Sequence, residues 1–180
     1  MSTPQTLLLL RHATAEPVLP GRSDAERPLS RRGRTEADGI GNFLHEQDLV
    51  VDRVLCSPAV RTRQTLEPLG LDAPVELVPL LHRASSGQVL ELVGDADADA
   101  TTVLVVGHAP AVPGVVRDIA DPDSSSPAAS AAVAVAVAVA EDFPPGTLAR
   151  LEVTGTWTDP SPATLVGVRL PTRGDGRYVS

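Results

Sequence analysis

Three short stretches of the chain place arginine or histidine directly after an apolar run or close behind one. Arg11 and His12 follow four leucines in "LLLLRH", Arg61 lies in "LCSPAVRTRQT", and His108 follows a glycine in "TTVLVVGHAP". Guanidinium groups bind phosphate oxygens in pairs, and a neutral imidazole can attack phosphorus as a nucleophile. These residue types predict metal-independent phosphoryl transfer at a single site, provided that the fold brings them together.

Each of these stretches follows an expected strand. Apolar runs predict strands at residues 6–10, 53–56, 75–78 and 102–106, and residues that favour a helix follow each of them. This alternation predicts an α/β three-layer sandwich, with a largely parallel central sheet flanked by helices. Because the carboxyl ends of parallel strands meet at one edge of a sheet, we expect Arg11, His12, Arg61 and His108 to converge there.

The turns after two of these strands carry helix-start signals. Ser57 suits the N-cap and Pro58 the first position of a helix, which places Arg61 about one turn into it. Pro110 is expected to open the helix that follows His108. The amino end of a helix favours an anion, so these starts agree with a phosphate ligand.

The rest of the chain is expected to belong to the same single domain, residues 1–180. The runs at residues 148–153 and 164–170 have no helix between them, so they either extend the sheet or form an antiparallel pair. The alternation of alanine and valine over residues 131–140 is compatible with a helix or a strand. Loops are expected at residues 17–28 and 121–127.

Composition excludes several classes of protein. The net charge of −8 and the 2% aromatic content argue against nucleic-acid binding. Cys56 is the only cysteine, which excludes a disulfide framework and a thiolate metal site and fits a reducing cytoplasm. The start "MSTPQ" has no basic segment, and the apolar residues 128–140 are too few to span a membrane. We therefore expect a cytoplasmic protein without a metal, a cofactor or a membrane partner.

The three stretches, in this order, resemble the signatures of the histidine phosphatase superfamily, which has a phosphoglycerate mutase-like fold. The resemblance covers roughly residues 6–153. The segments "ERPLSRRGRTEA" and "FPPGTLARLEV" are most similar to the small phosphohistidine phosphatases of the SixA type. The resemblance implies that His12 is the nucleophile and forms a phosphohistidine, that Arg11, Arg61 and His108 hold the phosphoryl group, and that Ser57 adds a hydroxyl or backbone donor.

The stretch "VPLLHRASSG" lies where members that cleave alkyl phosphate esters usually carry a carboxylic acid. It contains no carboxylate, and His82 lies nearest to the expected place. This absence favours a substrate with a good leaving group, such as a protein phosphohistidine. Two alternatives stay open, which are a phosphatase or mutase for a small phosphorylated metabolite and a catalytically weak module that binds phosphorylated ligands.

Three further residues could lie on the substrate side of the site. His82 could also be a partly exposed histidine beside Arg83. Arg22 and Arg27 could meet a second anionic group of the substrate, but the interleaved Asp24 favours a solvated run of charges. The arginines near the site are expected to lower the pKa of His12 and so to keep its imidazole neutral.

Overall fold

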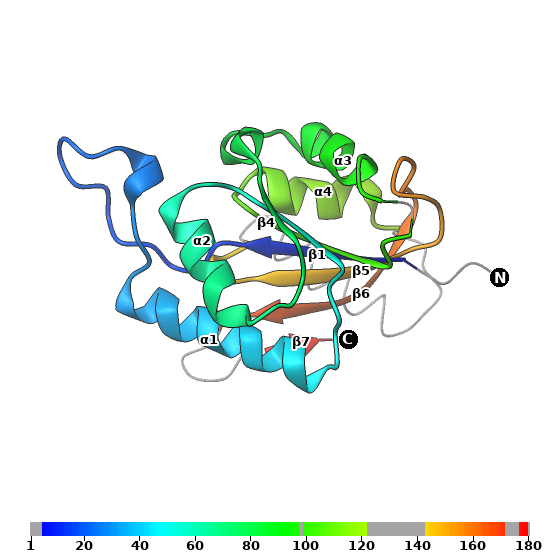
Figure 1. Ribbon diagram of the computed structural model, residues 1–180, viewed down its shortest axis with the longest axis horizontal. Helices are drawn as coiled ribbons and strands as arrows, with labels where there is room; N and C mark the ends of the chain where they lie inside the picture. The colour runs from blue at the N-terminus through cyan, green and yellow to red at the C-terminus, as the bar shows by residue number, and fades with distance from the viewer. Residues whose placement is uncertain (1–4, 98, 122–142, 172–176, 180) are drawn as a thin grey trace.

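The computed structural model describes residues 5–97, 99–121, 143–171 and 177–179, and the expected element at residues 131–140 lies outside them. The described strands form one sheet, with helices on both of its faces (Figure 1). In chain order the strands are β1 (Gln5–Arg11), β2 (Arg53–Cys56), β3 (Val75–Leu77), β4 (Thr102–Gly107), β5 (Leu148–Val153), β6 (Ala163–Leu170) and β7 (Arg177–Val179). The helices are α1 (Arg31–Glu46), α2 (Val60–Leu66), α3 (Ser86–Gly94) and α4 (Ala111–Ile119), with short 3-10 turns η1 (Asp24–Glu26), η2 (Glu67–Leu69) and η3 (Pro79–His82).

The seven strands lie in the order β3-β2-β4-β1-β5-β6-β7. The pairs among β3, β2, β4 and β1 are parallel, whereas β5 is antiparallel to both β1 and β6, and β7 is antiparallel to β6. Strand β6 therefore runs in the same direction as the parallel group. The expected α/β sandwich with a largely parallel sheet is confirmed, and the two late runs both pair with each other and extend the sheet.

The four leucines of β1 explain how the sheet is covered on both faces. All four side chains are fully buried, and successive residues of a strand point to opposite faces. Leu7 and Leu9 belong to the core cluster that contains the apolar residues of α3 and α4. Leu8 and Leu10 belong to the cluster that contains the apolar residues of α1. A continuous apolar run is thus what this central strand requires.

The carboxyl ends of three parallel strands lie at the same edge of the sheet. Arg11 at the end of β1 pairs with Gly107 of β4, and Cys56 of β2 pairs with Val106. The long segment after β1, blue at the left of Figure 1, projects from this edge and carries η1 before the chain enters α1. Residues that directly follow β1, β2 and β4 therefore meet here.

The start of α2 differs from the expectation. The helix begins at Val60 with Ala59 as its N-cap, so Ser57 is not the N-cap and Arg61 is already the second helical residue. The Ser57 hydroxyl has another partner, because its Oγ lies 2.8 Å from Nε2 of His108 but 3.4 Å from the Ala59 amide nitrogen. Ser57 therefore serves His108 rather than the helix.

Helix α4 also begins one residue later than expected, because Pro110 is its N-cap and Ala111 is its first residue.

In the part of the chain that the structure describes, no helix combines the length and the apolar character needed to cross a membrane.

Candidate active site

The backbone around His12 is fixed from three directions. The His12 amide donates to the Gly107 carbonyl at 3.0 Å, and the His12 carbonyl accepts from the Gly146 amide at 3.0 Å. The Ala13 amide donates to Oγ1 of Thr65 in α2, also at 3.0 Å. The candidate nucleophile is thus held by β4, by the turn before β5 and by α2.

The ring of His12 has a defined tautomer. Its Nδ1 lies 2.8 Å from the carbonyl oxygen of Ala13, and only 7% of the residue is exposed. Because a carbonyl oxygen only accepts hydrogen bonds, Nδ1 carries the proton and Nε2 keeps its lone pair in the neutral ring. Nε2 is therefore the nitrogen that can attack an electrophile.

The pKa of His12 is lowered from 6.5 to about 4. Burial is the largest cause, and the hydrogen bond to Ala13 opposes it, while the charges of Arg61, Arg11 and Arg27 lower the pKa further. The expected direction is correct, although burial contributes more than the arginines. His12 is neutral at pH 7, as a nucleophile requires.

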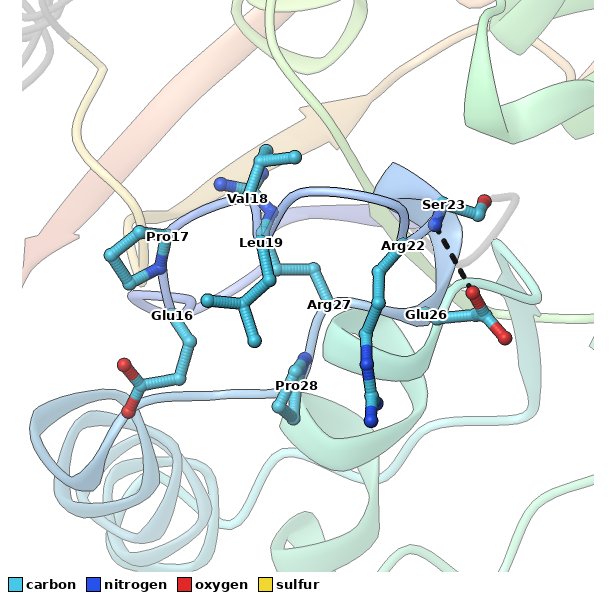
Figure 2. Close-up of a pocket in the computed structure, with 9 residues that line it drawn as sticks. All are labelled: Glu16, Pro17, Val18, Leu19, Arg22, Ser23, Glu26, Arg27 and Pro28. Atoms are coloured by element: carbon cyan, nitrogen blue, oxygen red, sulfur yellow. Dashed lines mark hydrogen bonds between the residues drawn. The ribbon is translucent and has the colours of Figure 1, made fainter.

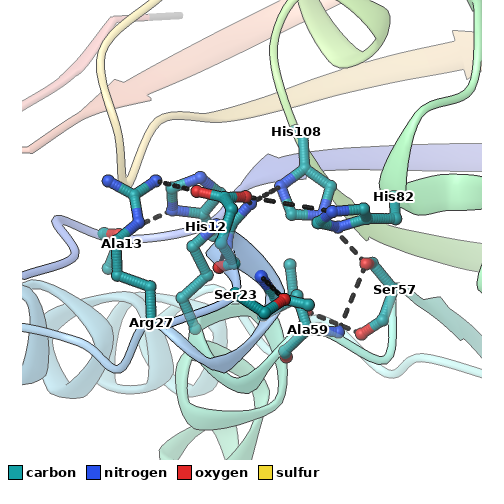
Figure 3. Close-up of polar contacts among 12 residues, drawn as sticks. His12, Ala13, Ser23, Arg27, Ser57, Ala59, His82 and His108 are labelled. Atoms are coloured by element: carbon teal, nitrogen blue, oxygen red, sulfur yellow. Dashed lines mark hydrogen bonds and ion pairs between the residues drawn. The ribbon is translucent and has the colours of Figure 1, made fainter. Parts of the chain in front are cut away.

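Arg61, His108 and Ser57 form a chain of hydrogen bonds beside His12. Nη2 of Arg61 lies 3.2 Å from Nδ1 of His108, and Nε2 of His108 lies 2.8 Å from Oγ of Ser57. The ring centroids of His12 and His108 are 5.1 Å apart, and Figure 3 shows His12, His108 and Ser57 gathered in one place. The structure thus brings four of the expected site residues together.

The hydrogen bonds of His108 also define its tautomer. A guanidinium only donates, so Nδ1 accepts from Arg61 and Nε2 carries the proton that it shares with Ser57. Burial, followed by the charges of His12, Arg61 and His82, lowers the pKa of His108 to about 3, although Asp24 opposes this shift. His108 is therefore a neutral donor in this structure.

Arg11 lies at the end of β1 and is half-buried. One of its Nη atoms donates to the carbonyl of Phe143, and its charge contributes to the lowered pKa of His12. Arg11 therefore contributes to the electrostatics of His12 from the side of the Phe143 segment.

Asp24 is the site residue that the sequence analysis missed. Nη1 and Nη2 of Arg61 donate to the backbone oxygen and to Oδ2 of Asp24 at 2.6 and 2.8 Å, and Nη2 of Arg27 lies 3.1 Å from Oδ1. The side chain of Asp24 is 46% exposed, as a solvated run of charges predicts, but it is paired with Arg61 and Arg27 rather than free. The motif Ser23-x-x-Glu26 forms a capping box around Asp24 and is a sequence signal for the turn, but not for its partner Arg61.

The carboxyl group of Asp24 is ionised at neutral pH. Burial alone would raise its pKa, but Arg61, Arg27 and His82 outweigh that effect, so the pKa lies below the ordinary 3.8. Asp24 therefore adds one negative charge to a site that holds Arg61 and the neutral His12 and His108.

His82 lies in η3 on the outer side of His108. The ring centroids of the two histidines are 5.1 Å apart, and Nε2 of His82 is 3.8 Å from Oδ2 of Asp24. The side chain is 22% exposed, so His82 borders both the site and solvent. The substrate-side location of His82 stays a prediction, because partial exposure also fits the alternative of a histidine at the surface.

Arg22 lies apart from these contacts, on the exposed part of the loop after β1. A pocket of about 340 Å³ lies in this loop, and the exposed Val18 and Leu19 line it together with Arg22 (Figure 2). The lining residues are Glu16, Pro17, Val18, Leu19, Arg22, Ser23, Glu26, Arg27 and Pro28.

Among the described residues, no group of three or more His, Cys, Asp or Glu side chains is placed to hold a metal ion.

Comparison with known sequences gives two kinds of match. The profile of the histidine phosphatase superfamily (branch 1) matches residues 7–96. An uncharacterised protein of Mycobacterium tuberculosis (strain H37Rv) is 39% identical over 165 residues, which cover 90% of this chain and 99% of the relative. The phosphohistidine phosphatase SixA of Escherichia coli is 31% identical over 119 residues, which cover 63% of this chain and 73% of SixA.

Solved structures agree with these matches. A structure assigned as the phosphohistidine phosphatase SixA of Nakamurella multipartitia is 36% identical with a TM-score of 0.78, covering 95% of this chain and 98% of the other. A protein histidine phosphatase SixA complexed with tungstate is 26% identical with a TM-score of 0.68, covering 89% and 94%. The phosphoglycerate mutase of Plasmodium falciparum, at 15% identity and a TM-score of 0.58, covering 98% and 94%, shares the fold.

Proposed function

We propose that this chain, which belongs to the histidine phosphatase superfamily and is a phosphatase, removes the phosphoryl group from phosphohistidine in a protein. The observation that carries the proposal is the buried, neutral His12 imidazole, whose Nδ1 donates to Ala13 and whose Nε2 keeps its lone pair. Two sequence relatives support the substrate class, since the E. coli protein is a phosphohistidine phosphatase and the Nakamurella structure is assigned as one.

In the first proposed step, Nε2 of His12 attacks the phosphorus atom of the substrate. The new bond joins Nε2 to phosphorus while the bond from phosphorus to the substrate nitrogen breaks. An imidazole that already carries a proton on its other nitrogen leaves as a neutral molecule. This leaving group needs no proton from the enzyme, which agrees with the lack of a carboxylate in "VPLLHRASSG".

In the second proposed step, water attacks the phosphorus atom of phosphorylated His12. The bond from phosphorus to Nε2 breaks, His12 recovers its lone pair, and inorganic phosphate leaves with the protons of the water shared between product and solvent. Arg11 and Arg61 would neutralise charge on the transferred group in both steps, and His108 and Ser57 would donate hydrogen bonds. A related SixA holds tungstate, a tetrahedral oxyanion, which supports a ligand of this shape.

His82 is proposed to lie on the substrate side of the phosphoryl group. It borders solvent and contacts His108, so a leaving group that approaches from outside would meet it first. Arg22 and Arg27 are proposed to contact the substrate protein beyond the phosphoryl group.

The proposal is tested by trapping the phosphorylated enzyme with a labelled substrate. A peptide with ³²P-labelled phosphohistidine is mixed with the protein, the reaction is stopped in alkali, and the labelled residue is identified by mass spectrometry. We expect the label on His12, and His12→Asn should lose the label and reduce turnover by about 10³-fold or more. The matched control is His45→Asn, because His45 is an exposed residue of α1.

Turnover and binding assays with sugar phosphates beside the phosphohistidine peptide separate the alternatives. Faster turnover of sugar phosphates than of the phosphohistidine peptide would replace the proposal with a phosphatase for small metabolites. Binding of both ligands without turnover or label would instead identify a binding module. Label on any residue other than His12 would contradict the proposed nucleophile.

A further inference from the structure

We propose that Asp24 is a positioning residue for phosphate recognition. Its carboxylate and backbone oxygen hold one end of the Arg61 guanidinium, so that the buried Nε–H of Arg61 is left for an oxygen of the phosphoryl group. The inference rests on the proposed function, because it assumes that a phosphoryl group binds at Arg61. It adds Asp24, from the loop after β1, to the residues that shape the proposed phosphate site.

The hydrogen bonds of Arg61 account for most of its donors. Nη1 donates to the backbone oxygen of Asp24, while Nη2 donates to Oδ2 of Asp24 and to Nδ1 of His108. Only 4% of Arg61 is exposed, and its Nε has no hydrogen-bond partner among the described residues. Three of the five guanidinium N–H groups thus have these acceptors, and the buried Nε–H is one of the two that do not.

A buried N–H of a charged group is costly when it has no acceptor. A phosphoryl oxygen that lies between Arg61, His108 and His12 would accept from this donor and remove that cost. The Nε–H of Arg61 is therefore a buried donor that an acceptor bound in this site can use.

Asp24 is itself held in place, so it can fix Arg61. Its Oδ1 accepts from Arg27 at 3.1 Å, and its backbone oxygen accepts from the Arg27 amide at 3.2 Å. The capping box of Ser23 and Glu26 closes the turn that carries Asp24. These contacts restrain the carboxylate before a ligand arrives, which reduces the entropy lost when the guanidinium is ordered.

The rival role for Asp24 is that of a resident anion. In that case the substrate phosphate would displace the carboxylate and take over both Nη atoms of Arg61. The two roles predict opposite effects of Asp24→Asn, which removes the charge but keeps the shape. Loss of a resident anion would strengthen phosphate binding, and simple removal of a nearby negative charge would act in the same direction. Weaker binding is therefore specific to positioning.

The experiment measures binding of inorganic phosphate by ³¹P NMR titration and isothermal calorimetry. We expect the phosphate Kd to rise about tenfold in Asp24→Asn and further in Asp24→Ala, since hydrogen bonds to a charged group are being weakened. Glu16→Gln is the matched control, because it removes one negative charge from an exposed position of the same loop and should leave the Kd within about twofold of the parent.

A double-mutant cycle separates positioning from a general structural effect. In an Arg61→Ala background, Asp24→Asn should change the phosphate Kd by less than about twofold, because its target is gone. An unchanged or lower Kd in Asp24→Asn alone would overturn the inference, and so would an equal tenfold loss in both backgrounds. If the parent binds no phosphate, or if Arg61→Ala binds it as well as the parent does, the proposed phosphate site fails before Asp24 is considered.

Discussion

At the residue scale, the proposed chemistry depends on keeping two imidazoles uncharged in a site that contains arginines. Burial lowers the pKa values of His12 and His108 to about 4 and about 3, and nearby charges add to this effect. The hydrogen bonds to Ala13 and Arg61 then fix which nitrogen of each ring carries the proton. Desolvation and tautomer selection together give a nucleophile that is ready at neutral pH.

Arg61 is expected to stabilise the charge of the transferred group. Arg61→Ala should remove about 3 kcal/mol of transition-state stabilisation, by analogy with loss of one donor to a developing charge. This loss corresponds to a roughly 150-fold decrease in kcat/KM. Arg61→Lys should recover only part of this loss, because an ammonium cannot make the same forked contacts. Steady-state kinetics on a phosphohistidine peptide measures the effect.

Arg63→Ala is the control for Arg61, since Arg63 is an exposed residue of the same helix. It should leave kcat/KM close to the parental value. If Arg61→Ala behaved like this control, the proposed role of Arg61 in phosphoryl transfer would be wrong.

The residues that the sequence predicted for the site differ from Asp24 in where they lie. His12 and His108 directly follow central strands, so the strand order alone places them at one edge. Asp24 lies in the loop between β1 and α1, and the partner of a loop residue depends on the tertiary path of the chain. Its contact with Arg61 therefore has no local signal in the sequence.

At the element scale, α1 supports the segment that carries His12. Ser30 caps α1, and its hydroxyl also donates to the Thr14 carbonyl at 3.0 Å. The buried Glu36 accepts from the amide and hydroxyl of Thr14 at 2.9 and 3.1 Å. Gly33 allows this close packing, because a Cβ at that position would lie 1.9 Å from the Thr14 carbonyl oxygen.

Gly33→Ala is therefore expected to force α1 away from Thr14. The free energy of unfolding should fall by about 1–3 kcal/mol, as for other overpacked sites, and turnover should fall because Thr14 follows the His12 segment. Gly87→Ala, in the first turn of α3, is the control, since the nearest atom to its added Cβ is 3.9 Å away. It should raise stability by up to about 1 kcal/mol. Equal stabilities of the two variants in urea denaturation would contradict this role of Gly33.

Strands were easier to predict from the sequence than helix starts. The apolar runs at residues 53–56 and 102–106 match β2 and β4 within one residue, because a strand buried on both faces needs an unbroken apolar run. The sequence predicts the start of α2 too early, because the Ser57 hydroxyl contacts His108 rather than capping the helix. A cap residue can serve the site instead of its helix, and only the tertiary structure shows which.

At the scale of the whole molecule, folding and the chemistry of the site are linked through the same two histidines. Folding brings β1 and β4 together and buries His12 and His108 at the edge that they share. Each ring binds its proton more weakly in the folded chain than at the ordinary pKa of 6.5. The pH dependence of stability therefore reports whether the site is assembled.

The free energy of unfolding is expected to fall as the pH drops from about 6.5 toward 5. In this range the unfolded chain protonates both histidines while the folded chain keeps them neutral, so each contributes a slope of about 1.4 kcal/mol per pH unit. The slope is half of this value at pH 6.5 and disappears by about pH 7.5, where the unfolded histidines are neutral too. Asp24 and Asp52 keep their charge down to lower pH, because their pKa values lie below 3.8.

Urea denaturation at pH 7.5, 6 and 5 measures the effect. His108→Asn should remove the contribution of one histidine to the slope of the unfolding free energy against pH. Equal stability of the parent at pH 7.5 and 5 would mean that these imidazoles are not buried in solution, and the neutral nucleophile would lose its physical basis.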